Sequence, residues 1–79
     1  MRIQVLGPGC VRCHTLSRNT AEAAASLGLD VQVEELADMG EIVRRGIMAT
    51  PALVVDDEVV LTGRVPTARH VRELLSARM

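Results

Sequence analysis

Residues 3–13, IQVLGPGCVRC, combine an apolar run, a glycine-rich segment and two closely spaced cysteines. The apolar run Ile3–Leu6 predicts a short buried strand, and the segment Gly7-Pro8-Gly9 predicts a tight loop after it. From Val11 to Leu27 apolar residues recur at helical spacing, so Cys10 and Cys13 lie where the loop opens a helix. A strand, a loop and a helix in this order favour an α/β protein.

Outward from this stretch, the pattern predicts five further elements. They are a strand over 31–34, a short helix that begins near Asp38 and stops at Gly46, strands over 52–55 and 59–61, and a helix opened by Pro66-Thr67. The order is β-α-β-α-β-β-α. A helix between the first two strands requires a parallel crossover, whereas the last two strands form an antiparallel hairpin across the turn Asp56-Asp57-Glu58. We therefore expect one domain, residues 1–79, with a mixed four-stranded sheet flanked by helices.

Composition narrows the class of function. The chain has 79 residues, a formal net charge of −1 and no aromatic residue. It therefore lacks the basic footprint of a general nucleic-acid binder and the stacking platforms that bind single strands. It has no apolar segment long enough to cross a membrane and no secretory signal pattern. We expect a cytoplasmic monomer that binds neither nucleic acid nor membrane.

Cys10-Val11-Arg12-Cys13 is the motif that carries chemistry. In a reducing compartment, a close cysteine pair is more often catalytic, redox-sensing or metal-binding than structural. At a helix N-terminus, unpaired N–H groups and the helix dipole favour a thiolate at Cys10, and the thiolate is the nucleophile. Arg12 can add to this field, and His14 is a second candidate for tuning a cysteine pKa. Gly7 and Gly9 keep the loop free of bulk, which would let another protein's disulfide approach.

Two motifs give the chain a resemblance to a known family. The first is Gly7-Pro8-Gly9-Cys10 with Cys13. The second is ATPALVV, residues 49–55, followed by Asp57 and by VVLTG, residues 59–63. Over nearly its whole length the chain resembles the thioredoxin-like superfamily, in particular its small redox-active disulfide proteins of thioredoxin or glutaredoxin type.

The resemblance implies roles for particular residues. Cys10 is similar to the family's exposed nucleophile and Cys13 to its resolving thiol, so together they would form the redox-active disulfide, with no other cofactor. Pro51 resembles the family's cis proline, and the backbone of Thr50 would pair with an extended substrate. A glycine after the fourth strand, here Gly63, would complete the substrate groove. Disulfide-containing proteins are the implied targets, and a thioredoxin-reductase-like flavoprotein is the implied electron donor.

The chain also departs from the family's larger members. Gly9 stands where they carry a tryptophan, and Val11-Arg12 replaces the Gly-Pro between the cysteines of thioredoxin. The strand over residues 3–6 offers no match for thioredoxin's buried acid beneath the resolving cysteine.

Other functions use the same residues. Cys10 and Cys13 could hold Cu(I), or Zn with His14 or His70, which would make the chain a metal carrier or sensor. The sequence Cys10-Val11-Arg12-Cys13-His14 also matches the haem c attachment motif, although a strand before the motif and a hairpin after it are unlike a cytochrome. A third alternative is a redox-regulated interaction domain that does not turn over. Bound metal that a chelator removes would distinguish a metal protein from an oxidoreductase.

Overall fold

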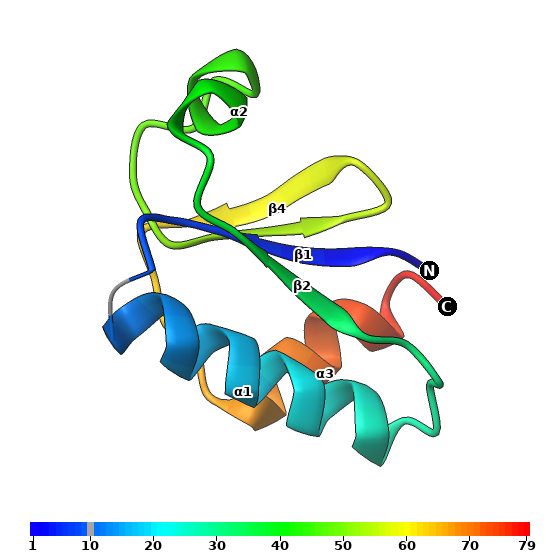
Figure 1. The fold of residues 1–79 in the computed structure, drawn as a ribbon. Coiled ribbons are helices and arrows are strands. Elements are labelled where there is room, and N and C mark those ends of the chain that lie inside the picture. The colour runs from blue at the N-terminus through cyan, green and yellow to red at the C-terminus, as the bar shows by residue number, and fades with distance from the viewer. Residues whose placement is uncertain (10) are drawn as a thin grey trace.

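The computed structural model describes residues 1–9 and 11–79 and has the element order that the sequence predicts (Figure 1). Nothing is described for residue 10. Four strands and three helices follow one another along the chain: β1 (Ile3–Leu6), α1 (Val11–Ser26), β2 (Val33–Leu36), α2 (Met39–Arg44), β3 (Ala52–Val55), β4 (Glu58–Thr62) and α3 (Ala68–Ser76).

The strands form one mixed sheet in the order β2-β1-β3-β4. β1 pairs in parallel with β2 and antiparallel with β3, and β3 pairs antiparallel with β4. The helix between β1 and β2 is the crossover that a parallel pair requires. The fold class predicted from the sequence, a mixed four-stranded sheet flanked by helices, is therefore confirmed.

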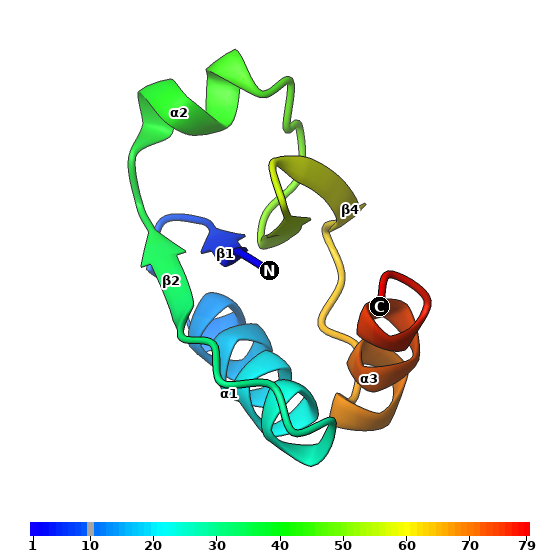
Figure 2. The same cartoon turned by 90° about the vertical axis from the view of Figure 1, so that its right-hand side faces the viewer.

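The helices cover the two faces of the sheet unequally. Figure 2 shows α1 and α3 together on one face and α2 on the other. The larger apolar cluster lies beneath α1 and α3 and includes Ile3, Leu16, Leu53 and Leu75. The smaller one lies on the α2 side and is made by Leu6, Ile42, Ile47, Ala52 and Val54. Alternation along β1 and β3 sends successive side chains to these two clusters, so both faces of the central strands are buried.

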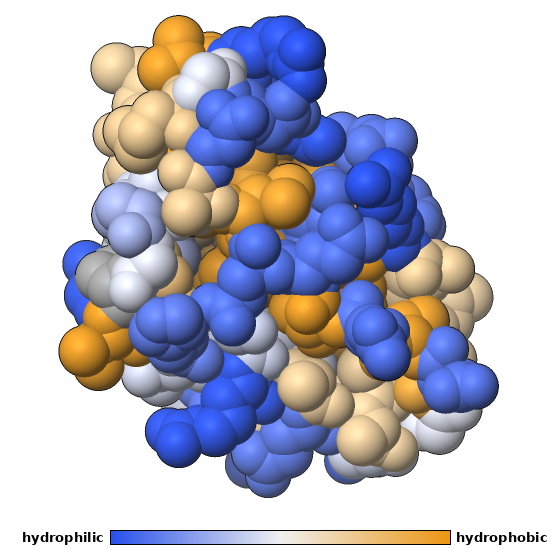
Figure 3. All heavy atoms as spheres, in the orientation of Figure 1, coloured by the Kyte–Doolittle hydropathy of each residue, from blue (hydrophilic) through white to orange (hydrophobic). Residues whose placement is uncertain are grey.

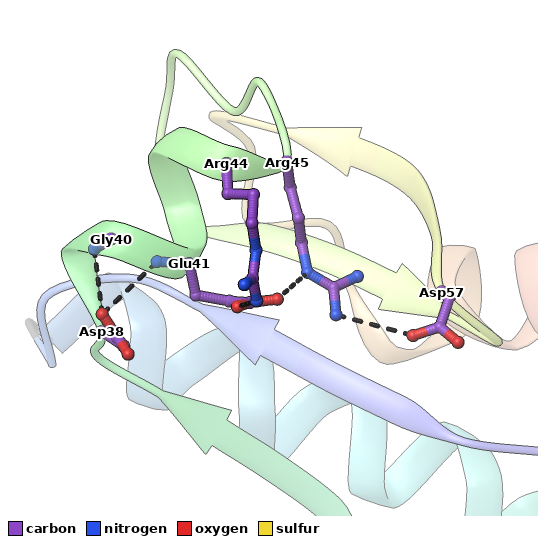
Figure 4. Close-up of polar contacts among 6 residues, drawn as sticks. All are labelled: Asp38, Gly40, Glu41, Arg44, Arg45 and Asp57. Atoms are coloured by element: carbon purple, nitrogen blue, oxygen red, sulfur yellow. Dashed lines mark hydrogen bonds and ion pairs between the residues drawn. The ribbon is translucent and has the colours of Figure 1, made fainter.

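Capping groups and ion pairs fix the position of α2. The side chain of Asp38 accepts hydrogen bonds from the backbone N–H groups of Gly40 and Glu41, which satisfies donors that the first turn leaves unpaired. Glu41 forms ion pairs with Arg44 and Arg45 (Figure 4). Arg45 also reaches Asp57 in the β3–β4 turn, with 3.5 Å between Nη2 and Oδ1. These contacts tie the short helix to the hairpin.

Several element boundaries differ by one or two residues from those predicted. β2 begins at Val33 and runs to Leu36, later than the predicted 31–34, because its register places Val33 opposite Ile3 and Leu36 opposite Leu6. Val31 still packs against the larger cluster, but from outside the strand. The β3–β4 turn is also tighter than predicted: Asp56 and Asp57 have φ values of 50° and 66°, and Glu58 already belongs to β4. Consecutive positive φ angles are typical of the two-residue turns that join antiparallel strands.

In the part of the chain that the structure describes, the helices are too short or too polar to cross a membrane.

Candidate active site

Residues 11–13 of the predicted cysteine motif form the N-terminal end of α1, shortly after the loop that follows β1. Cys13 is in the first turn of the helix and only 2% exposed. The thiol of Cys13 is therefore enclosed by the protein rather than presented at the surface. Cys10, the predicted nucleophile, lies outside the described residues.

Gly7, Cys13 and Pro51 meet at one point, although Pro51 is far from the others in the sequence. A Cβ built on Gly7 would overlap the Cys13 sulfur and would lie 3.7 Å from Cα of Pro51. Gly7 itself is buried, and its N–H donates to the carbonyl of Leu36 at the end of β2, at 2.9 Å. We predicted that the lack of bulk at Gly7 lets a target approach, and that stays a prediction. In the structure the absence of a side chain at Gly7 makes room for the sulfur of Cys13.

The peptide bond between Thr50 and Pro51 is cis, as the resemblance implies for this position. Pro51 is fully buried immediately before β3, where its missing N–H removes no bond from the sheet. Thr50 is partly exposed, so its backbone lies at the boundary between the core and the surface. Pro51 therefore forms the inner wall of the site and Thr50 its rim.

Arg12, between the two cysteines, contacts the segment after β4. Its Nη2 donates to the carbonyl oxygen of Gly63 at 2.9 Å. The N–H of Gly63 in turn donates to the carbonyl oxygen of Pro51, also at 2.9 Å. Gly63 has a φ of 70°, and a Cβ added to it would lie 3.0 Å from Cβ of Ala49, so a larger residue fits poorly here. These bonds bring the cysteine motif, the proline and the glycine after β4 into one connected site.

The two histidines are placed differently. His14 is exposed, and its Nδ1 lies 2.7 Å from a carboxylate oxygen of Glu35 on β2. His70 is on α3, on the wall of a surface groove away from this pair. Within residues 1–9 and 11–79, no three His, Cys, Asp or Glu side chains come together as a metal site. Glu35 was not among the predicted site residues. No local sequence pattern indicates its contact with His14, because the two residues lie on different elements, a helix and an edge strand.

Apolar side chains are exposed around the site. Met48, shortly before Thr50, is 99% exposed, and Val11, directly before Arg12, is 80% exposed. In Figure 3, apolar surface is visible at the N-terminal end of α1 and over α2, and further apolar areas lie between the hydrophilic ones across this face.

Comparison with known proteins agrees with this geometry. A family model described as "Thioredoxin domain" matches residues 1–76. A protein named "Thioredoxin" from Methanothermobacter thermautotrophicus is 38% identical over 76 residues, which cover 96% of this chain and 99% of that protein. A second protein named "Thioredoxin", from Methanocaldococcus jannaschii, is 29% identical over 75 residues, which cover 95% of this chain and 86% of that protein.

A mixed four-stranded sheet, a buried Cys13 in the first turn of α1 and a cis proline beside it are typical of a thioredoxin-like protein. The chain belongs to the thioredoxin domain family. Membership of this family supports a thioredoxin-like redox function.

Proposed function

We propose that this protein is a thiol–disulfide oxidoreductase that exchanges a Cys10–Cys13 dithiol with the disulfides of target proteins. The observation that carries the proposal is the buried sulfur of Cys13, packed against Gly7 and beside the cis proline Pro51, three residues after Cys10. The two relatives named "Thioredoxin" support the same chemistry.

The proposed reaction has two exchange steps. The Cys10 thiolate attacks one sulfur of the target disulfide, forms a mixed disulfide and releases the other target sulfur as a thiolate. The Cys13 thiol then loses its proton and attacks the Cys10 sulfur, which closes the Cys10–Cys13 disulfide and releases the second target thiolate. The target gains two electrons and, from solvent, two protons. The same two electrons leave the protein.

Each residue near the cysteines has a role in this scheme. Thr50 and Pro51 hold the backbone of the target beside the cysteines, while Arg12 and His14 adjust the electrostatic field around the thiolate. A thioredoxin-reductase-like flavoprotein returns two electrons and restores the dithiol. We propose that the protein works in this cycle as a cytoplasmic monomer.

The test is a redox titration of Cys10 and Cys13 after metal removal, with trapping by alkylation and readout by mass spectrometry. We expect one reversible two-electron transition between about −180 and −300 mV, the range of dithiol exchange proteins. Failure of the two cysteines to form an intramolecular disulfide would overturn the proposal. Metal that co-purifies with the protein and is removed by a chelator would favour the carrier or sensor alternative.

A further inference from the structure

A groove on the surface lies between the edge strand β4 and α3, next to the candidate active site. Figure 2 shows the segment 63–67 running from the end of β4 to the start of α3. The groove has a volume of about 400 Å³, and its lining includes Val60, Leu61, Val65 and Leu74 together with Arg64 and His70. β4 pairs with β3 alone, so its other edge is open toward this side. The lining of the groove thus combines apolar side chains with two basic ones.

The charge in the groove is not neutralised. Arg64 is exposed and makes no hydrogen bond or ion pair with the other described residues, and no carboxylate lines the groove. Two acidic residues belong to the same elements but are engaged elsewhere. Glu58 of β4 is paired with Arg78 at 2.9 Å, and Glu73 of α3 lines a separate depression with Arg69. An occupant that complements the groove therefore carries an aliphatic side chain and a carboxylate.

The groove begins where the candidate active site ends. Arg64 directly follows Gly63, whose carbonyl oxygen accepts the hydrogen bond from Arg12 and whose N–H donates to Pro51. A polypeptide whose cysteine reacts at the motif can therefore continue past Gly63 into the space between β4 and α3.

We propose that the groove binds the chain segment adjoining the target's reactive cysteine, and that it selects segments with an aliphatic residue beside an acidic one. This inference rests on the proposed exchange function and specifies its substrate class. Arg64 attracts the carboxylate, while Val60 and Leu74 take up the aliphatic side chain. Attraction between opposite charges acts mainly by speeding the encounter of two molecules. We therefore expect preferred segments to react with a higher second-order rate constant, and we expect salt to reduce this difference.

The test uses the reduced full-length protein and short peptides whose single cysteine is blocked as a mixed disulfide with 2-thiopyridine. The cysteine is flanked by Leu-Glu, Leu-Gln, Leu-Lys or Ser-Glu, on either side in separate peptides. Release of 2-thiopyridone gives the second-order rate constant. At low ionic strength we expect Leu-Glu to react about threefold or more faster than Leu-Lys on at least one side, with the gap closing in concentrated salt. The Leu-Glu peptide should also react with a higher rate constant than the Ser-Glu peptide, because serine lacks the aliphatic side chain.

Two variants with the same change in charge locate the effect. Arg64→Glu is expected to reverse the preference between Leu-Glu and Leu-Lys. Arg72→Glu, on α3 but outside the lining of this groove, is expected to preserve the order. Equal responses of the two variants would show that only net charge matters and would overturn the groove assignment. Far-UV circular dichroism checks that both variants are folded.

A neutral small disulfide separates failure of this inference from failure of the proposed function. If oxidised 2-mercaptoethanol reacts but all peptides react equally, the groove selects nothing and the exchange function stands. If neither reacts, the exchange function itself is wrong. As a second readout, Cys13→Ser trapped with the Leu-Glu peptide should shift the NMR signals of Val60 and Leu74. Shifts confined to α2 and the segment before Thr50 would overturn the groove as the binding site.

Discussion

The sulfur of Cys13 occupies the space that a side chain on Gly7 would need. Gly7→Ala therefore forces either the loop after β1 or the first turn of α1 to move. We expect a loss of about 1–3 kcal/mol in the free energy of unfolding, the usual cost of overpacking a buried site. Urea denaturation followed by far-UV circular dichroism measures it, since the chain has no aromatic residue for fluorescence.

The matched control for Gly7→Ala is the same substitution in a Cys13→Ala background, where the sulfur is absent. The cost there should be much smaller, because the two changes act on the same space and are not additive. An equal cost in both backgrounds would show that the sulfur of Cys13 is not what excludes a side chain at position 7.

The roles of the two cysteines predict opposite results for their serine variants. Cys10→Ser should abolish exchange, because the attacking thiolate is gone. Cys13→Ser should accumulate a mixed disulfide between Cys10 and the target, because nothing resolves it. Non-reducing electrophoresis and mass spectrometry of the reaction with a disulfide substrate detect the adduct. Equal rates in the wild type and in Cys10→Ser would contradict the assignment.

The hydrogen bond from Arg12 to Gly63 predicts a modest effect on stability. Arg12→Ala should lower the free energy of unfolding by about 0.5–1 kcal/mol, as expected for one exposed hydrogen bond. Arg12→Lys keeps the charge without the planar guanidinium and should recover only part of this loss. Arg18→Ala is the control, because Arg18 is exposed on the same helix and makes no hydrogen bond or ion pair with the described residues. Urea midpoints that do not differ between Arg12→Ala and Arg18→Ala would count against the contact.

Arg45 and Arg44 form a matched pair on α2, since both contact Glu41 (Figure 4). The side chain of Arg45 is 19% exposed and also reaches Asp57, whereas that of Arg44 is 75% exposed. Arg45→Ala should therefore cost about 1 kcal/mol or more, and Arg44→Ala less than about 0.5 kcal/mol, the value typical of exposed pairs. Thermal unfolding of the two variants compares them directly. If Arg44→Ala lost more stability than Arg45→Ala, the contact of Arg45 with Asp57 would make no contribution to the free energy of unfolding.

The ion pair between Glu58 and Arg78 predicts a dependence on pH. The hydrogen bond and charge of Arg78 hold the pKa of Glu58 below its ordinary value. A carboxylate with a lowered pKa in the folded state stabilises the protein above its unfolded pKa, and this contribution disappears as the pH falls through the folded pKa. In Arg78→Gln, an NMR titration should show the Glu58 pKa returning toward its ordinary value. An unchanged titration curve would mean that the pair does not form in solution.

Much of the fold was predictable because local patterns and long-range packing agree. The run Ala52–Val55 is apolar on both faces, and the structure buries all of it as β3 between β1 and β4. Thr67 caps α3 by accepting a hydrogen bond from the N–H of His70, close to where the sequence places the helix start. Local signals of this kind determine where an element begins and which face it buries.

The contacts that connect the site could not be predicted in the same way. Arg12 and Gly63 are 51 positions apart, and no periodicity links an exposed arginine to one particular carbonyl group. The contact of His14 with Glu35 depends on the register of β2, which begins later than the alternation of side chains predicted. At Gly7 the sequence shows that a side chain is absent. It does not show that the sulfur of Cys13 fills the space that a side chain would need.

Because the two faces of the sheet are covered unequally, the helices on them should differ in how readily they open. α2 covers its face of the sheet alone, with Ile42 as its one buried residue, whereas α1 and α3 pack against each other over the larger cluster. Elements with few buried contacts open at lower free energy than the core does. The backbone amides of α2 should therefore exchange with solvent hydrogen well before those of α1. The segment between α2 and Pro51 should loosen at lower free energy than the helix that carries Cys13.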